Sequence, residues 1–482
     1  MQRRHFLNLS GITSLAILGG CNQKSGGMGG NMQEPDPRTS SGNTASLSQA
    51  LPIPTLLRPT TIGGVDHYDL TIQASTHQFF EGINTATYGI SASYLGQTLL
   101  MRNGNEVAIN YTNKLSVDTT MHAHGLHVPA SMDGTAHQTI QPNTTWTATY
   151  TINQEASTNW YHSHAMHKTA EQVYKGLAGL IIIEDDNSDS LDLPKRYGID
   201  DIPLVLQDRA FVNGQIDYSP SMRETMRGYI ADTFIANGAI QPSVSVEAKE
   251  IRFRILNGSN ATIYNLGFSD GRAFKQIATD GAFLENPVTI TRLLLSPAER
   301  AEIVIDLSQD FNQALSLQEF NYGKTFLNIN INQSANIVTT LPNTLNSLTR
   351  FNPLDAVNTR RFVLGGKRGV LTINSVAMDM AVINERVPLN QIEIWEIQND
   401  MMIDHNFHIH ATHFMLLERN GSSANILANE KGYKDVALVP ANGSIKIILK
   451  MIDYSNASVP YMYHCHILEH EDAGMMGQFV VV

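Results

Sequence analysis

The chain has 482 residues, which is too long for one hydrophobic core and fits two to four domains. Charged residues make up 16% of the sequence, less than the usual roughly 25%, and the formal net charge is -12. This balance argues against a nucleic-acid-binding protein, which would carry a basic surface. The only cysteines are Cys21 and Cys465, and if Cys465 binds a metal, no disulfide remains to stabilise the fold.

Residues 1–21 are typical of an export signal. Arg3 and Arg4 precede a short apolar run at residues 12–18, which is too short to cross a bilayer. The arginine pair resembles a twin-arginine signal, so we expect a periplasmic protein. The sequence LGGC at residues 18–21 resembles a lipobox, in which Cys21 would carry a lipid; ordinary signal-peptidase cleavage near residue 21 is the alternative.

Residues 22–50 are rich in Gly, Ser, Asn and Thr and poor in apolar residues, so we expect a flexible linker. From residue 51 onward, short segments of alternating apolar and polar residues are separated by Gly, Pro and Asn turns. Examples are VAINYTN at residues 107–113 and IEIWEIQN at residues 392–399. This pattern predicts an all-β protein built from β-sandwiches.

An internal repeat divides this folded part into three similar domains. A strand-like segment ends in Asn three times, at Asn113, Asn257 and Asn399. Roughly 30 to 40 residues after each Asn, a second strand-like segment begins with a proline. The repeat predicts domains at residues 51–186, 187–345 and 346–482.

Four His-x-His pairs occur, at His122/His124, His162/His164, His408/His410 and His464/His466. The first and third pairs lie at the same offsets from Asn113 and Asn399, whereas the middle domain has Leu266 and Phe268 at these places. Because alternate residues of a strand share a face, each pair can reach one metal ion or two neighbouring ions. Eight imidazoles would suit about three ions, with positions left for a ligand such as dioxygen.

The last pair encloses Cys465 in the stretch HCHILEHEDAGM, residues 464–475. The thiolate of Cys465, the imidazole of His470 and the thioether of Met475 suit copper better than zinc. His405 is the natural source of a second imidazole. Because strand neighbours point to opposite faces, Cys465 would serve one metal site and the flanking histidines another, joined by a covalent path for electrons. The alternative is surface histidines around a small buried cysteine.

The four motifs resemble those of the multicopper oxidases, and specifically the three-domain bacterial branch of laccases and copper-efflux oxidases: HAHGL at 122–126, HSH at 162–164, HNFHIH at 405–410 and HCHILEHEDAGM. The resemblance covers the chain after residue 50 and implies three consecutive cupredoxin-like Greek-key β-sandwich domains, the middle one without copper ligands. Asn406 departs from the family, which most often has Pro at this place.

Four copper ions are implied by this resemblance. A type 1 copper would lie on His405, Cys465 and His470, with Met475 as axial ligand. A type 2 copper would lie on His122 and His408, and a type 3 pair on the remaining six: His124, His162, His164, His410, His464 and His466.

The resemblance also implies an oxidoreductase that couples four one-electron oxidations to the reduction of dioxygen to water, in copper or metal homeostasis. Cys465 would carry electrons, entering through an exposed edge of His405 or His470. Asp133 and Glu471 match the acids assigned to proton delivery in similar enzymes, although either could be a solvated loop carboxylate. A non-catalytic periplasmic copper-binding protein is the alternative.

The reductant stays open between cuprous ion, ferrous ion and phenolic compounds. The methionine-rich insert of the cuprous-ion-specialised relatives is missing, since residues 331–360 contain no Met. Asp400 and Met402 nevertheless resemble part of the substrate-copper site of that branch, and Asp355 could supply another carboxylate. We expect a monomer that contacts a membrane only through a lipid on Cys21.

Overall fold

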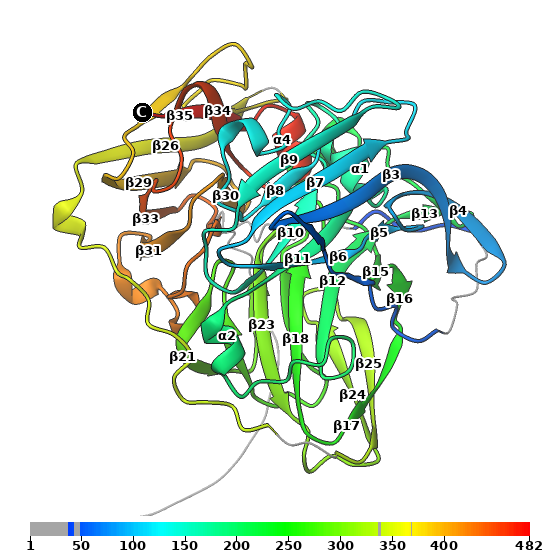
Figure 1. The fold of residues 1–482 in the computed structure, drawn as a ribbon. Helices are drawn as coiled ribbons and strands as arrows, with labels where there is room; N and C mark the ends of the chain where they lie inside the picture. The colour runs from blue at the N-terminus through cyan, green and yellow to red at the C-terminus, as the bar shows by residue number, and fades with distance from the viewer. Residues whose placement is uncertain (1–36, 43–48, 336–338, 368) are drawn as a thin grey trace, which may run out of the picture. The chain divides into compact units, whose positions relative to one another are not determined.

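The computed structural model describes residues 37–42, 49–335, 339–367 and 369–482. Six large sheets form three sandwiches that follow one another along the chain (Figure 1). Strands such as β29 (Ile392–Asn399) alternate strictly between buried and partly exposed side chains, as the sequence pattern requires. The prediction of an all-β fold with three cupredoxin-like sandwiches is confirmed. No helix within the described residues is both long and apolar enough to span a membrane.

The first sandwich has two sheets. In order across the sheet, the strands of one are β1 (Leu56–Leu57), β6 (Thr98–Arg102), β11 (Ala178–Glu184), β10 (Ser157–His162) and β8 (His122–His124). The other comprises β5 (Leu95–Gly96), β4 (Ile83–Ile90), β3 (Val65–Phe80), β7 (Glu106–Asn113) and β9 (Thr145–Thr151), and β2 (Thr60–Ile62) pairs with β3. Its helical turns are η1 (Ala130–Met132), α1 (Thr169–Tyr174) and α2 (Asp186–Ser190).

The second sandwich has one sheet of seven strands and one of five. The larger comprises β16 (Ala239–Ile240), β15 (Thr233–Ala236), β12 (Asp201–Arg209), β18 (Glu250–Asn257), β23 (Arg300–Asp306), β20 (Phe274–Ala278) and β21 (Phe283–Ile290). The smaller comprises β17 (Ser243–Glu247), β25 (Lys324–Gln333), β24 (Gln313–Glu319), β19 (Tyr264–Phe268) and β22 (Leu293–Leu295). The hairpin β13 (Phe211–Val212) and β14 (Gln215–Ile216) and helix α3 (Met222–Arg227) complete it.

The third sandwich has two five-stranded sheets. One comprises β27 (Val370–Ile373), β26 (Asn358–Lys367), β29, β33 (Ser444–Lys450) and β31 (Phe414–Arg419). The other comprises β28 (Glu385–Val387), β35 (Met476–Val481), β34 (Asn456–His464), β30 (His405–Ile409) and β32 (Val436–Val439). Its helical turns are η2 (Pro353–Asp355), η3 (Ser423–Asn425), η4 (Ala428–Glu430) and α4 (Leu468–Asp472).

The three repeat asparagines end equivalent strands, which confirms the internal repeat. Asn113 ends β7, Asn257 ends β18 and Asn399 ends β29, and all three side chains are fully buried. In each case the side-chain amide donates to carbonyl oxygens of two separate chain segments, at 2.8 to 3.2 Å. A buried amide needs such partners. The asparagine at the end of the strand therefore links equivalent segments in each domain.

Residues 37–42, which the composition placed in a flexible linker, instead pair with the middle domain. Arg38 and Ser41 form parallel bridges to this domain. Arg38 also forms ion pairs with Asp217 at 3.0 Å and with Glu224 of α3 at 3.7 Å. Main-chain hydrogen bonds and ion pairs need no apolar side chains, so a polar segment can still add to a sheet edge.

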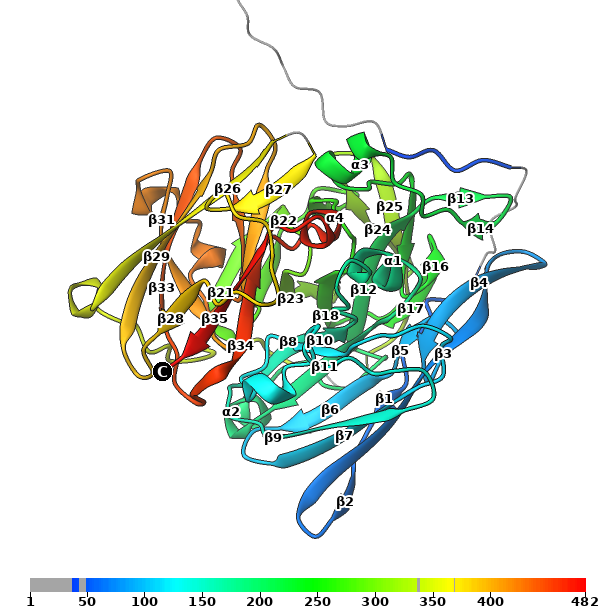
Figure 2. The same ribbon diagram turned by 90° about the horizontal axis from the view of Figure 1, so that it is seen from above.

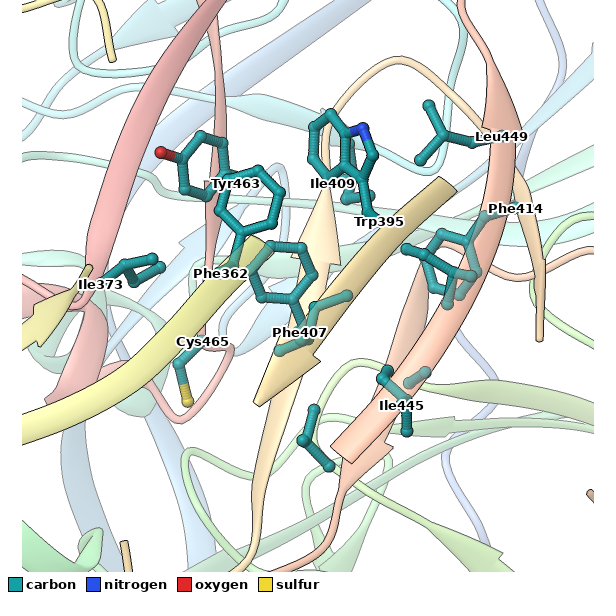
Figure 3. Close-up of a cluster of buried hydrophobic side chains, with 14 of the residues drawn as sticks. Phe362, Ile373, Trp395, Phe407, Ile409, Phe414, Ile445, Leu449, Tyr463 and Cys465 are labelled. Atoms are coloured by element: carbon teal, nitrogen blue, oxygen red, sulfur yellow. The ribbon is translucent and has the colours of Figure 1, made fainter. Parts of the chain in front are cut away.

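The core of the third sandwich is an aromatic cluster that ends at the cysteine. Phe362, Trp395, Phe407 and Tyr463 pack together with ring centroids 4.7 to 6.5 Å apart. Cys465 lies at the margin of this cluster (Figure 3) and is fully buried. The packed rings therefore fix the backbone from which the thiol projects.

Candidate metal centre

The four His-x-His pairs lie at the ends of strands that are paired in register. His122 lies opposite His162 on β8 and β10 in the first domain, and His408 lies opposite His464 on β30 and β34 in the third. The second histidine of each pair is two residues further along. None of the eight side chains is more than 2% exposed. The histidines are therefore gathered where the first and third domains meet, as predicted.

The ring nitrogens of these histidines approach one another closely. His464 Nε2 lies 3.2 Å from His164 Nε2 and 3.1 Å from His410 Nε2, and the three form one compact group. A second group joins His162 Nε2 to His124 Nδ1, at 3.4 Å. Within each group the potential ligand atoms lie within 4.8 Å of one another. Each arrangement can hold a metal ion between its nitrogens.

Several of these nitrogens have no hydrogen-bond partner among the residues that the structure describes. They are Nε2 of His122, Nε2 of His408 and both ring nitrogens of His466. A buried polar atom without a partner costs about 1–3 kcal/mol, and such atoms are rare in folded proteins. Imidazole nitrogen is a preferred ligand of copper, so this donor set fits copper ions.

Burial holds several of these histidines in the neutral form that binds a metal. Burial, together with the neighbouring imidazoles, lowers the pKa of His164, His408 and His466 well below the ordinary value. Burial also lowers the pKa of His410 to about 4. At neutral pH these rings carry no proton that a metal ion would have to displace from the ligating nitrogen.

Backbone carbonyl oxygens set which nitrogen faces the centre. Nδ1 of His122, of His162 and of His408 each donates to a carbonyl oxygen at 2.8 Å, which leaves Nε2 free. His124 has the opposite arrangement. Its Nε2 contacts a carboxylate oxygen of Asp435 at 3.1 Å, and its Nδ1 faces the group.

Cys465 lies in a separate group with His405 and His470. Its Sγ lies 3.8 Å from His470 Nδ1, and the rings of His405 and His470 are 4.9 Å apart. Met475 is buried in the same hydrophobic cluster as Cys465. Burial raises the pKa of the Cys465 thiol to about 12 in the metal-free chain. A metal ion is therefore needed to draw off its proton, and thiolate with two imidazoles and a thioether suits copper.

The two predicted acids both touch the histidine cluster. Asp133 Oδ2 lies 2.7 Å from His410 Nδ1, and Glu471 lies 3.3 Å from His464 Nδ1 and 3.5 Å from His164 Nδ1. Both acids are fully buried, so neither is a solvated loop carboxylate. Their electrostatic settings differ. Burial would raise the pKa of Asp133, but His410 and His122 hold that pKa well below its ordinary value, whereas burial raises the pKa of Glu471.

Asp355 is separated from the other predicted substrate residues. It lies in η2, just before β26, at the end of the sheet where β29 begins, whereas Asp400 directly follows β29. The eight residues of β29 span roughly 26 Å at about 3.3 Å per residue. The expectation that Asp355 adds a carboxylate beside Asp400 and Met402 is therefore wrong. Asp400 and Met402 are exposed on the turn that leads into His405.

The predicted exposed edge of His405 or His470 is also wrong, since both side chains are fully buried. Helix α3 of the middle domain contacts α4, which carries His470, and both helices lie close together in Figure 2. Met226 of α3 packs against the cluster that contains Cys465. A segment from a different domain thus covers this group, and no local sequence pattern near the ligands could indicate that.

Asp435 and Arg300 were not identified from the sequence, although both adjoin the histidine cluster. Asp435 contacts His124, and Arg300 forms a bidentate ion pair with Asp435. His413 also lies 3.8 Å from the Asp435 carboxylate. None of them falls in a ligand motif, so the sequence carries no direct signal for them.

Known proteins match the chain over most of its length. Family models described as multicopper oxidase match residues 71–188, 198–339 and 341–482. The chain is 36% identical to "Multicopper oxidase mco" of Staphylococcus haemolyticus over 422 residues, 87% of this chain and 89% of that protein. It is 33% identical to "Cell division protein FtsP" of Xenorhabdus nematophila over 449 residues, 89% of this chain and 92% of that protein. A solved laccase-like multicopper oxidase from Ochrobactrum sp. is 34% identical with a TM-score of 0.83, covering 90% of this chain and all of that chain.

Proposed function

Because the chain belongs to the multicopper oxidase family, we propose that it couples four one-electron oxidations of a reductant to the reduction of dioxygen to two waters. The family makes the protein a copper-dependent oxidoreductase that uses oxygen. The observation that carries the fuller proposal is the position of Cys465 between His464 and His466. The cysteine belongs to the group with His405 and His470. In the histidine cluster, His464 approaches His410 and the His466 ring packs against that of His162.

The donor sets support four copper ions. We assign a type 1 ion to His405, Cys465, His470 and Met475. We assign a type 2 ion to His122 and His408, and a type 3 pair to the six other cluster histidines: His124, His162, His164, His410, His464 and His466. When bound, the copper ions would supply one-electron redox chemistry and a place for dioxygen to bind.

The protein's own residues supply the path for electrons and the protons. Electrons pass from the Cys465 sulfur along the backbone to the neighbouring histidines, a short covalent route between two rigid groups. Four protons are needed for each dioxygen, and Asp133 and Glu471 adjoin the histidine cluster. Burial raises the pKa of Glu471 and so favours the protonated form that can donate, while His410 and His122 overcome burial, lower the pKa of Asp133 and favour the carboxylate that can accept a proton and pass it on.

Because the type 1 ligands His405 and His470 are buried, a small metal ion is a better candidate reductant than a large organic molecule. A bulky phenol cannot contact His405 or His470, because both are fully buried. The residues Met222 on α3 and Met402 are 76% and 65% exposed, and the thioether sulfur of methionine is a soft ligand for cuprous ion. We therefore propose metal-ion oxidation, in copper or metal homeostasis, as the main activity.

Oxygen uptake by the copper-loaded chain tests this proposal. We expect about four coppers per chain, four cuprous ions oxidised per dioxygen, and a higher kcat/KM for cuprous or ferrous ion than for a dimethoxyphenol. Met222→Leu combined with Met402→Leu should lower kcat/KM for cuprous ion. Met380→Leu is the matched control, since Met380 lines a groove with His137 and Val459 instead. A phenol preferred over both metal ions would contradict the substrate assignment.

A non-catalytic role is the second candidate, favoured by the relatives named as cell division proteins. A periplasmic protein that only binds copper would take up the metal without consuming dioxygen. Copper-loaded chain that consumes no dioxygen with any of the three reductants would decide for this role.

We also propose export to the periplasm through the twin-arginine segment, with a lipid on Cys21 and a monomeric state. Both Arg3–Arg4 and Cys21 lie outside the described residues. Cell fractionation tests the export, and replacing both Arg3 and Arg4 by Lys should retain the protein in the cytoplasm. Cys21→Ser should release a membrane-bound form, and light scattering should give the mass of one chain.

A further inference from the structure

Two aspartates hold the histidine cluster in matching ways from the two sides. The carbonyl oxygen of Asp133 accepts from Nδ1 of His122 in its own domain, and its carboxylate binds His410 of the third domain. Asp435 repeats this arrangement. Its carbonyl oxygen accepts from Nδ1 of His408 in its own domain, at 2.8 Å, and its carboxylate binds His124 of the first domain, at 3.1 Å.

The rings joined by each aspartate are stacked. The His124 and His408 rings, both held by Asp435, lie 3.8 Å apart with an angle of 9° between their planes. The His122 and His410 rings, both held by Asp133, lie 4.0 Å apart at 22°. Each aspartate therefore fixes one ring from the first domain against one from the third.

Only one of the two aspartates is clamped by a cation. Arg300 donates from Nη1 and Nη2 to the two carboxylate oxygens of Asp435, each at 2.6 Å. In contrast, the groups that lie against the Asp133 carboxylate are the histidines themselves. A bidentate arginine fixes a carboxylate in position as well as in charge. The position of the Asp435 carboxylate is thereby fixed by Arg300. The Asp133 carboxylate instead interacts with His122 and His410 of the cluster.

Arg300 comes from the middle domain, which contributes no copper ligand. It begins β23, it is fully buried, and its Nε donates to the Thr158 carbonyl of the first domain at 3.0 Å. Gly125 follows His124 with a φ of +86°. A Cβ there would lie 2.7 Å from Arg300 Nη2 and 2.8 Å from Asp435 Oδ2. The backbone at Gly125 thus packs directly against the ion pair between Arg300 and Asp435.

From this geometry we infer that Arg300 and Asp435 are positioning residues for the metal centre, which make His124 present Nδ1 to the cluster. The carboxylate accepts the Nε2 proton of His124, so the lone pair is left on Nδ1. Without Asp435, nothing favours the Nε2-protonated tautomer of His124, which is opposite to the Nδ1-protonated tautomer of its neighbours. The inference rests on the proposed copper centre, but the tautomer of His124 is a property of the metal-free chain.

Three variants of the full-length chain test this inference. Asp435→Asn removes the acceptor charge, and Arg300→Lys keeps the cation but loses the bidentate geometry. Arg254→Lys is the matched control, because Arg254 is a buried middle-domain arginine that pairs with Asp201 and Glu302 and with no histidine. Copper content, the blue absorption of the Cys465 group, and the histidine tautomers of the metal-free chain by nitrogen-15 NMR are measured on each.

We expect Asp435→Asn to retain the blue absorption, to bind copper at the histidine cluster 10- to 100-fold more weakly, and to lose the Nε2-protonated signal of His124. Arg300→Lys should show the same changes to a smaller degree, and Arg254→Lys should show none. If Asp435→Asn does not fold, the tautomer of His124 in Arg300→Lys decides. Unchanged copper content and an unchanged tautomer in both variants would overturn the inference. A wild-type chain that has this tautomer yet binds no copper would overturn the proposed function instead.

Discussion

His408 lies directly opposite His464 across the antiparallel strands β30 and β34. The same relationship joins His122 to His162 in the first domain. Backbone pairing thus fixes half of the cluster before any side chain is considered, because register decides which residues face each other. A shift of one residue in either strand pair would turn these rings to the opposite face.

Replacing the cysteine should remove the blue colour together with turnover. A serine hydroxyl at position 465 is neither soft nor anionic at neutral pH, so Cys465→Ser loses the strongest type 1 ligand. Absorption spectra and oxygen uptake of the copper-loaded variant check this. Ser163→Ala, at the equivalent place between His162 and His164, is the control and should stay blue. A blue and active Cys465→Ser variant would refute the assignment.

Glu471→Gln should slow the reaction with dioxygen and spare the reduction of the type 1 group. Burial raises the pKa of this carboxyl and favours its protonated form, and glutamine keeps the shape without the acidic proton. Loss of a positioned acid costs about 10²–10⁴-fold. Stopped-flow absorption would separate anaerobic bleaching of the blue colour, expected to be unchanged, from reoxidation.

Glu469→Gln is the matched control for this experiment. Glu469 is also buried on α4, but its carboxylate accepts from Asn260 at 2.9 Å and from Tyr218 at 2.9 Å. It does not touch the cluster, so reoxidation should stay fast. Equal slowing in both variants would point to a disturbed helix and not to a lost proton donor.

Asp472 should make the metal-free chain less stable as pH rises. Burial raises its pKa to about 7, from an ordinary value of 3.8, so between these pH values the folded chain holds a proton that the unfolded chain has lost. Stability therefore falls as pH rises through this range, by at most ~4 kcal/mol from this group. Above about pH 7 the full cost is present.

Thermal unfolding of the metal-free wild type and Asp472→Asn between pH 5 and 8 measures this contribution. The variant cannot ionise, so its Tm should depend less on pH than the wild-type Tm. Other buried acids are common to both proteins and cancel in the comparison. Parallel Tm profiles would show that Asp472 does not titrate in this range.

Asn406, where the family most often has proline, should tune the potential of the type 1 group. Its side-chain oxygen lies 3.6 Å from Cys465 Sγ and accepts from the His466 amide at 2.7 Å. The negative end of this dipole stabilises the oxidised, more positive centre. Asn406→Leu should therefore raise the reduction potential by up to about 60 mV, a tenfold change in a one-electron equilibrium. Redox titration of the blue band measures it, and an equal or lower potential would contradict the argument.

The sequence was informative wherever a feature is local. Alternation of side chains identified the strands, and the offsets from Asn113 and Asn399 identified matching histidines, because both depend on neighbouring positions. The prediction that Cys465 and its flanking histidines belong to different groups follows from the same two-residue period. It needed no knowledge of how the domains pack.

Features that depend on contacts between domains could not be predicted in this way. Asp133 lies 20 residues after Asn113 (113 to 133), whereas Asp435 lies 36 residues after Asn399 (399 to 435). The two aspartates have the same role, but the loops before them differ in length. A fixed offset from the repeat asparagine therefore identifies the histidines but not Asp435. The helix over His470 was missed for a related reason, because α3 comes from the middle domain.

The histidines of one cluster span positions 122 to 466, a separation of 344 residues (466 − 122). During synthesis, the first domain therefore leaves the ribosome long before its partner ligands have been translated. A nascent or truncated chain that lacks the third domain carries the first-domain histidines but not the complete cluster. Metal uptake by the groups that combine both domains, such as His164, His410 and His464, thus reports that both ends of the polypeptide have been made and have docked.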